Sequence, residues 1–419
     1  MSYLTVNGGK KLRGEISIHG AKNSVLPLLA ATFLCRGQSI LHNCPWLSDV
    51  KVSLDILSHL GCSCRREGNT VIIDSPNSGG CDIPEYLMRE MRSSIVFMGA
   101  VAAKTGYAVM SLPGGCELGP RPIDIHIDAL KRLGATVEYD AGRLVCDIPD
   151  GVKGTELHLK FPSVGATENI ILASATGRGT TVIRNAAREP EIVDLASFLN
   201  LSGADIKGAG TDTVVINGVS SLKGTEYTVM PDRIIAATCM FAVAACGGKI
   251  TVNNAVTEHL VPIICCLRDS GCDIEAVQKR LTVSMYSRPV NFDTVTTQPY
   301  PGFPTDAGPL LVAMSAVSKG TGVFIENIFD NRFRYVDEMK RFGADIKTVG
   351  RVAVITGVKA LCGAEVRSYD LRGGAALTVA AMSACGRSII NNPEYIDRGY
   401  EKIENIFGNF GADIKRIQE

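Results

Sequence analysis

Six copies of one sequence pattern recur along the 419 residues, and this repetition limits the possible folds more than any other feature. Each copy is a helix-like run that ends in Gly followed by Ala or Cys, and a strand-like stretch follows it. We expect the shared glycine to end each helix in the left-handed conformation, which glycine adopts at little steric cost. Short polar turns inside the strand-like stretches predict a hairpin in each copy. The shared glycines are separated by 73, 69, 68, 72 and 68 residues; they are Gly61, Gly134, Gly203, Gly271, Gly343 and Gly411.

A second element alternates with this pattern: a helix rich in Ala and Ser, then a glycine, then a strand-like run, as in residues 240–254 and 377–392. Small side chains allow close approach, so we expect these helices to pack inside the sheet layers. One repeat of about 70 residues is too short to be reliably stable alone. The sequence therefore predicts an α/β protein in which six repeats form two domains of three.

Charge and cysteine content narrow the class of protein. The 43 Lys and Arg side chains balance 43 Asp and Glu side chains, so no overall field would draw the chain to nucleic acid or to a membrane. The N-terminus lacks the apolar run of a signal peptide, and no stretch predicts a membrane-spanning helix. Fourteen cysteines and six histidines are scattered without zinc spacing. We therefore expect a cytosolic chain with reduced thiols and no metal site.

Residues 112–124 read LPGGCELGPRPID, which is too rich in Pro and Gly for a regular helix or strand. The resulting loop carries Cys116, a nucleophilic thiol, five residues before Arg121. Taken alone, a reactive thiol and an incidental cysteine in a surface turn are equally good interpretations.

Lys22 lies at the start of an apolar helix-like run. We expect Asn23 or Ser24 to cap this helix and Lys22 to lie just outside its N-terminus. A lysine beside free backbone amides forms a good anion site, although a solvated lysine in a turn is the commoner arrangement.

Eight motifs occur in one order from end to end of the chain: HGAKNS, PGGCELGPRPID, NAAREPEIVD, PDR, PTD, DNRF, YDLR and YIDRGYEKIE. Together they resemble the UDP-N-acetylglucosamine 1-carboxyvinyltransferase family of enolpyruvyl transferases. The resemblance implies two inside-out α/β barrels of three βαβαββ repeats each. One domain would comprise residues 1–21 and 230–419, and the other residues 22–229, with the loop around Cys116 as a lid hinged at Gly114 and Gly115.

The resemblance also implies a reaction. The enolpyruvyl group of phosphoenolpyruvate would move to the 3-hydroxyl of UDP-N-acetylglucosamine with release of phosphate, the first committed step of peptidoglycan precursor synthesis. No cofactor, nucleic acid or membrane partner is implied, and the oligomeric state stays open.

The reaction needs an acid, a base and cations for two anionic substrates. By resemblance, Cys116 is the proton donor and forms a covalent adduct, and Asp306 is the base, with Asp370 supporting it. The implied phosphoenolpyruvate contacts are Lys22, Arg121 and Arg398, with Arg92 and Arg372 supporting an anionic cleft. The implied nucleotide-sugar contacts are Asn23, Pro122, Ile123, Asp124, Ile125, Ser163, Val164, Gly165 and Ile328.

The chain departs from the family pattern at four places. Ile235 replaces an acid, Ala307-Gly308-Pro309 follows Asp306 in place of a hydrophobe and Gln, Phe161 replaces a lysine, and Asp330 replaces a glutamate. These changes leave open the loop geometry after Asp306 and the number of diphosphate contacts. Three alternatives remain: the sister enzyme acting on shikimate 3-phosphate, a non-catalytic regulator that binds UDP-sugars, and, more remotely, an RNA phosphate cyclase.

Overall fold

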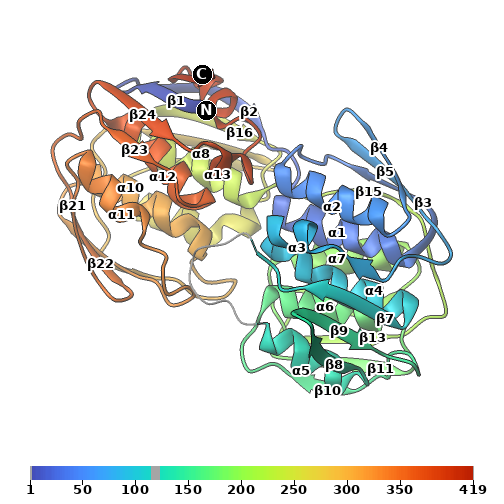
Figure 1. Cartoon of the computed structure of the whole chain (residues 1–419). Coiled ribbons are helices and arrows are strands. Elements are labelled where there is room, and N and C mark those ends of the chain that lie inside the picture. Colours follow the sequence, from blue (N-terminus) through green and yellow to red (C-terminus); the bar gives the residue numbers. More distant parts are fainter. Residues whose placement is uncertain (1, 115–122, 419) are drawn as a thin grey trace. The chain divides into compact units, whose positions relative to one another are not determined.

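The computed structural model describes residues 2–114 and 123–418, which divide into two compact units (Figure 1). Unit 1 comprises residues 2–19 and 231–418, and unit 2 comprises residues 20–114 and 123–230. Each unit contains three sheets with helices packed against them. This arrangement confirms the α/β class and the six predicted repeats. The described strands form six separate sheets and do not close into one continuous barrel.

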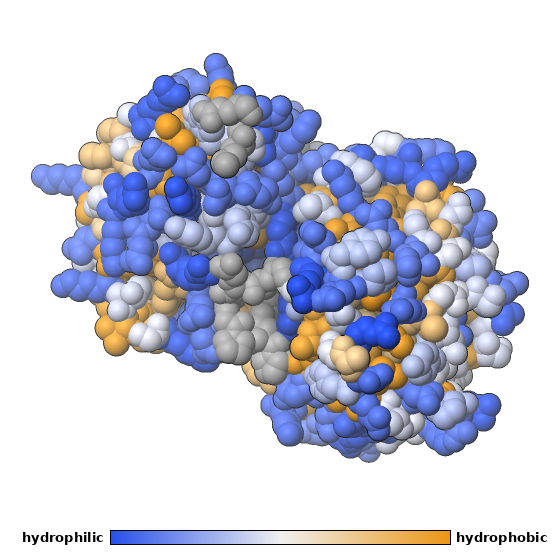
Figure 2. All heavy atoms as spheres, in the orientation of Figure 1, coloured by the Kyte–Doolittle hydropathy of each residue, from blue (hydrophilic) through white to orange (hydrophobic). Residues whose placement is uncertain are grey.

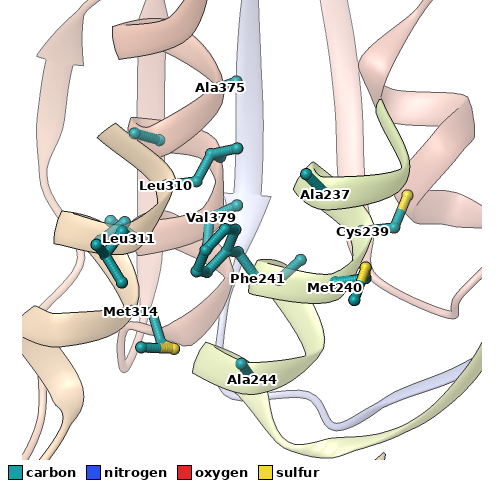
Figure 3. Close-up of a cluster of buried hydrophobic side chains, with 14 of the residues drawn as sticks. Ala237, Cys239, Met240, Phe241, Ala244, Leu310, Leu311, Met314, Ala375 and Val379 are labelled. Atoms are coloured by element: carbon teal, nitrogen blue, oxygen red, sulfur yellow. The ribbon is translucent and has the colours of Figure 1, made fainter. Parts of the chain in front are cut away.

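Three helices form the buried centre of each unit, as their small side chains predict. Phe241, Leu310 and Val379 come from three different helices of unit 1 and point toward one another (Figure 3). Burying one such side chain contributes about 1.5–3 kcal/mol. The central helices are α1 (Lys22–Leu34), α4 (Phe97–Thr105) and α6 (Val164–Ser174) in unit 2, and α8 (Arg233–Cys246), α10 (Gly308–Val317) and α12 (Leu371–Ser383) in unit 1.

The remaining helices complete the repeats. Those of unit 2 are α2 (Ser48–His59), α3 (Glu85–Glu90), η1 (Arg92–Val96), α5 (Asp124–Arg132) and α7 (Pro190–Leu201). Those of unit 1 are η2 (Thr257–Leu260), α9 (Val261–Asp269), η3 (Thr305–Ala307), α11 (Tyr335–Arg341), α13 (Glu394–Asp397) and α14 (Ile403–Gly408).

All six sheets share one pairing scheme, in which one edge strand pairs parallel with its neighbour and the remaining strands pair antiparallel. The first sheet of unit 2 is β14 (Leu222–Lys223), β3 (Cys35–His42), β5 (Thr70–Ser75) and β4 (Ser63–Glu67), with β15 (Glu226–Thr228) also on β3. The second sheet of unit 2 is β6 (Asp82–Ile83), β7 (Tyr107–Ser111), β9 (Arg143–Asp147) and β8 (Thr136–Asp140). The third is β10 (Glu156–His158), β11 (Thr180–Arg184), β13 (Thr213–Asn217) and β12 (Asp205–Lys207).

The N-terminal strands of the chain join two different sheets of unit 1. The first sheet of unit 1 is β2 (Leu12–Ser17), β16 (Gly248–Asn253), β18 (Arg280–Met285) and β17 (Asp273–Val277). The second is β19 (Thr294–Thr296), β20 (Thr321–Ile325), β22 (Val352–Thr356) and β21 (Asp345–Val349). The third is β23 (Glu365–Arg367), β24 (Arg387–Asn391), β1 (Ser2–Asn7) and β25 (Asp413–Gln418). The prediction of a hairpin in every repeat is therefore wrong for the sixth, because β25 pairs with β1 from the start of the chain. A pattern that is local in sequence cannot indicate a partner strand some 400 residues away.

The six shared glycines all have the expected left-handed backbone, with φ between 77° and 105°. Each follows a helix and turns the chain into the next strand, which confirms the predicted caps. Within residues 2–114 and 123–418, no helix is long and apolar enough to cross a bilayer. Hydrophilic residues predominate on the face drawn in Figure 2, with hydrophobic residues interspersed among them.

Candidate active site

Asp306 is the centre of a charged cluster in unit 1. It lies in η3, which leads directly into α10. Its Oδ1 accepts hydrogen bonds from Arg372 Nε at 3.0 Å and from Arg332 Nη2 at 3.3 Å. The two arginine side chains are only 5% and 2% exposed, whereas the Asp306 side chain keeps 27% of its surface. The carboxylate is thus the accessible member of a buried ionic group.

The charges of this cluster keep Asp306 ionised. Burial alone raises the pKa of Asp306, but Arg372 and then Arg332 outweigh it and hold the pKa well below its usual range. For Arg372, burial lowers the pKa, while attraction to Asp306 reverses this and raises the pKa above its ordinary value. The cluster therefore presents a carboxylate that stays charged, backed by two permanent cations.

Asp370 supports the same cluster through the backbone. It is the N-cap of α12, where its Oδ1 accepts from the amides of Arg372 at 3.0 Å and Gly373 at 2.9 Å. The same oxygen lies 4.0 Å from Arg332 Nη1. Asp370 Oδ2 is buried and has no hydrogen-bond partner among the described residues. Asp370 therefore fixes the turn of helix from which Arg372 reaches Asp306.

Arg398 follows α13 directly, on a turn that packs against the start of α12. Gly399 lies so close to Leu371 that an added Cβ would meet its side chain at 2.8 Å. Tyr400, next along this turn, accepts from Arg372 Nη1 at 3.5 Å and is 2.8 Å from Thr238 Oγ1. The turn that carries Arg398 thus adjoins the Asp306 cluster.

Ile328 lies on a segment that is held by Glu326. The Glu326 side chain is fully buried and accepts from the hydroxyls of Thr297 at 2.9 Å and Thr305 at 2.7 Å. It also accepts from the Ile328 amide at 2.7 Å. One carboxylate therefore joins the Ile328 segment to the residue immediately before Asp306.

The departures from the family pattern are accommodated locally. Ile235 is 1% exposed in α8, and its amide donates to Asp232, the cap of that helix, at 3.1 Å. Gly308 begins α10 against Phe324, where an added Cβ would lie 2.5 Å from the ring. Asp330 pairs with Arg351 on the surface. Phe161 is 42% exposed. The chain after Asp306 thus enters a regular helix.

Lys22 begins the central helix α1 in unit 2, which corrects one expectation. The N-cap is Ala21, without a side-chain cap among the described residues, so Lys22 is the first helical residue and neither Asn23 nor Ser24 caps the helix. Ser24 instead donates to the buried carboxylate of Asp194. A short serine side chain inside the first turn points to α7 because that helix packs directly on α1.

Lys22 forms a buried ion pair. Its Nζ lies 2.7 Å from Asp49 Oδ2, and the two side chains are 10% and 4% exposed. Asp49 stands in the first turn of α2. A cation at a helix N-terminus opposes the helix dipole, and the nearby carboxylate offsets that repulsion.

Six of the residues expected to bind the nucleotide sugar lie at the starts of α5 and α6. Asp124 is the first residue of α5 and is exposed, with Ile123 as its N-cap and Ile125 following. Ser163 caps α6 and accepts from the Ala166 amide at 3.3 Å. Gly165, after Val164 in the first turn, lies where an added Cβ would be 3.2 Å from the His126 ring.

Asn169 connects these helix starts. Its Oδ1 accepts from the Gly99 amide at 2.7 Å, so its Nδ2 is the donor to Ile95 O and to His126 Nδ1, both at 2.9 Å. The His126 ring therefore accepts at Nδ1, and its Nε2 edge is the one nearer Gly165. One buried amide thus holds η1, α4, α5 and α6 together.

The first arm of the loop that carries Cys116 is fixed. Arg92 Nη1 donates to Pro113 O at 3.3 Å, and the Gly114 amide donates to Met88 O at 3.1 Å. A Cβ on Gly114 would lie 2.3 Å from Arg89 O, so only glycine fits there. The predicted site residues Cys116, Arg121 and Pro122 lie outside the described residues.

Several residues of these clusters were not predicted from the sequence. Arg332 lies in the DNRF motif, and that motif is the one signal that could have identified it. Asp49 and Asn169 carry no local signal, because each acts on residues of other elements, and the contacts of Glu326 with Thr297 and Thr305 likewise exist only in the folded chain. Among the described residues, no group of three or more His, Cys, Asp or Glu side chains is placed to hold a metal ion.

Comparison with known proteins assigns the family. Residues 6–407 match the model of the family described as EPSP synthase (3-phosphoshikimate 1-carboxyvinyltransferase). The chain is 49% identical over 417 residues to UDP-N-acetylglucosamine 1-carboxyvinyltransferase 2 of Caldanaerobacter subterraneus, with 100% of both chains covered. It is 42% identical over 420 residues to the Thermotoga maritima UDP-N-acetylglucosamine 1-carboxyvinyltransferase, again with full coverage of both. The chain belongs to the UDP-N-acetylglucosamine 1-carboxyvinyltransferase family.

Solved structures agree on the fold of this UDP-N-acetylglucosamine 1-carboxyvinyltransferase family member. The enolpyruvyl transferase NikO from Streptomyces tendae superposes with a TM-score of 0.90 at 22% identity, covering 100% of this chain and 99% of that one. An EPSP synthase from Acinetobacter baumannii gives a TM-score of 0.76 at 18% identity, with 100% of both chains covered. These structures confirm the enolpyruvyl transferase fold expected from the motifs, and the sequence relatives confirm the family.

Proposed function

We propose that this chain transfers the enolpyruvyl group of phosphoenolpyruvate to the 3-hydroxyl of UDP-N-acetylglucosamine and releases phosphate. The observation that carries the proposal is Asp306, a partly exposed carboxylate kept ionised by Arg372 and Arg332 in a chain of this family. The reaction would take place in the cytoplasm as the first committed step of peptidoglycan precursor synthesis.

Asp306 acts as the general base. As the 3-hydroxyl oxygen bonds to C2 of phosphoenolpyruvate, the hydroxyl proton moves to the carboxylate and another acid protonates C3. Loss of a proton from C3 then re-forms the C2–C3 double bond as the bond from C2 to the phosphate oxygen breaks and phosphate leaves. A carboxylate held by two guanidinium groups is a weak base. We therefore expect an anionic substrate to draw one guanidinium away, which would raise the basicity of Asp306 when both substrates are bound.

The remaining roles follow the family motifs. Cys116 protonates C3 and forms a thio-adduct, and Lys22, Arg121 and Arg398 bind phosphoenolpyruvate. Arg92 and Arg372 support the anionic substrates, and Asp370 positions Arg372. For the nucleotide sugar, the first turns of α5 and α6 offer backbone amides of the kind that bind diphosphate. The predicted contacts of the nucleotide sugar are Asn23, Pro122, Ile123, Asp124, Ile125, Ser163, Val164, Gly165 and Ile328.

The decisive test is phosphate release by the purified chain. Phosphate should appear only when phosphoenolpyruvate and UDP-N-acetylglucosamine are both present, and shikimate 3-phosphate should not replace the nucleotide sugar. Nucleotide-sugar binding without turnover would favour a non-catalytic regulator instead.

The thiol role is tested separately. Cys116→Ser should severely reduce turnover and abolish covalent labelling by fosfomycin, a thiol-directed epoxide. The control is Cys265→Ser, which removes an exposed thiol in α9 of unit 1. Unchanged labelling of the Cys116→Ser protein would refute the assignment of that thiol.

A further inference from the structure

The sixth repeat places two exposed thiols opposite each other. Cys362 precedes β23 and Cys385 precedes β24, and the two form an isolated parallel β-bridge. The Cys385 amide donates to Leu361 O at 2.8 Å, and the Gly363 amide donates to Cys385 O at 2.7 Å. Both cysteines are exposed, and neither is in a disulfide. Backbone hydrogen bonds on both sides therefore hold the two thiol-bearing residues in register.

The same bridge occurs in two other repeats with different residues. It joins Lys153 to Arg178 in the third repeat and Val290 to Lys319 in the fifth. Each bridge lies just ahead of the first two strands of its sheet. Since two cations, or a valine and a lysine, occupy these positions equally well, the backbone pairing does not require sulfur. Of these three bridges, only that of the sixth repeat brings two thiols together.

The geometry of a β-bridge suits a covalent link. Neighbouring strands lie about 4.7–4.9 Å apart, and residues paired in register project to the same face. Disulfides span Cα–Cα distances of about 4.4–6.8 Å. Cys265 and Cys266 provide a contrast, because they follow each other along α9, where one is exposed and the other is buried. Consecutive residues of a helix point in different directions.

We propose that Cys362 and Cys385 form a redox-active dithiol that small-molecule disulfides oxidise to a reversible intramolecular disulfide. One cysteine thiolate attacks a sulfur of the small disulfide and releases the first small thiolate. The other cysteine thiolate then attacks the mixed disulfide at the protein sulfur and releases the second. The protein loses two electrons and two protons, and the small disulfide is reduced to two thiols.

The link would close residues 362–385 into a ring that contains the whole of α12. It would tie the end of this helix to the segment before β23. Asp370 and Arg372 lie at the opposite end of the same helix. The dithiol is therefore a site separate from the proposed catalytic residues, and its chemistry does not depend on the proposed function.

The test is oxidation of the folded full-length chain with oxidised glutathione, followed by alkylation and tryptic mapping without reduction. Cys362 falls in tryptic residues 360–367 and Cys385 in residues 373–387, and each peptide has a single cysteine. We expect these two peptides to be linked at about tenfold the yield of any other pair, because neighbouring thiols have a high effective concentration. Dithiothreitol should release them.

Two variants and one control make the result unambiguous. Cys362→Ser and Cys385→Ser should each abolish the link and leave the remaining cysteine as a mixed disulfide with glutathione. Exposed Cys265, as the internal control, should stop at the mixed disulfide. Separate glutathionylation of Cys362 and Cys385 without a link, or a link that forms only in urea, would overturn the proposal.

Discussion

The two units are built from the same repeat, but they treat the N-termini of their central helices differently. In unit 1, α8 and α12 are capped by the carboxylates of Asp232 and Asp370, and Asp306 stands in the turn before α10. In unit 2, α1 begins at Lys22 after an uncapped Ala21, as far as the described residues show. The turn leading into α4 begins at Arg92, and α6 is capped by a neutral serine.

This difference changes where each helix start finds its counter-charge. A carboxylate satisfies free amides and the positive end of the helix dipole, so the helix ends of unit 1 carry their own counter-charge. A cation in the first helical turn is unfavourable by about 0.3–1 kcal/mol unless an anion lies nearby. In unit 2 the cation Lys22 has its counter-charge in Asp49 of the neighbouring helix α2, whereas the helices α8 and α12 of unit 1 carry a carboxylate in their own caps.

The largest expected effect is the loss of turnover when the carboxylate of Asp306 in unit 1 is removed. Asp306→Asn should lower turnover by about 10²- to 10⁴-fold, the usual contribution of a general base. Binding of UDP-N-acetylglucosamine, measured by calorimetry, should change far less. The matched control is Asp337→Asn, which removes an exposed carboxylate of the same unit. Equal losses of binding and turnover would reduce Asp306 to a structural residue.

In unit 2, removing the carboxylate of Asp49 should lower the stability of the protein. Asp49→Asn leaves the buried Lys22 without its carboxylate and should lower the free energy of unfolding by about 3 kcal/mol in urea titrations. Inorganic phosphate should recover part of this loss if Lys22 binds anions. As a control, Asp82→Asn breaks an exposed pair with Arg143 and should have little effect. An Asp49→Asn protein as stable as the parent would refute the role of Asp49.

Substitutions of the helix caps should have smaller effects on stability, and they compare the two units directly. Asp232→Ala should cost about 1–2 kcal/mol of unfolding free energy, and Ser163→Ala about 1 kcal/mol, because only the first also removes a charge from a helix end. Urea titrations at low and high salt check this, since salt should reduce the difference. A larger cost for Ser163→Ala would contradict the contrast drawn between the two units.

The smallest expected effect is the change in the ionisation of Asp306 with pH. The low pKa of Asp306 means that its carboxylate should not titrate in the free protein above about pH 4, the ordinary range of Asp. Stability from the ionised form is complete above that pH and is lost only as the pH falls toward the folded-state pKa. Carbon-13 shifts of the Asp306 carboxyl, assigned with Asp306→Asn, would show this. A transition between pH 5 and 8 would contradict it.

Much of the architecture was predictable because it repeats. Helix caps such as Gly343 and the alternation of β22 are local patterns, and six copies make each one readable. The motifs also indicated Asp306, Asp370 and Arg372 together. The partner of β25 was not predictable, nor was the pairing of Lys22 with Asp49, because both depend on segments that meet only in the folded chain.

By itself, the sequence determined the repeat, the class of fold and the family, because periodicity and ordered motifs are properties of the chain. Tertiary structure alone decided which charges meet. It placed Arg332 and Arg372 on one carboxylate oxygen, set Asp49 against Lys22, and brought Cys362 beside Cys385. Electrostatic and covalent chemistry act over a few ångströms, and such distances between remote residues exist only once the helices and sheets have packed.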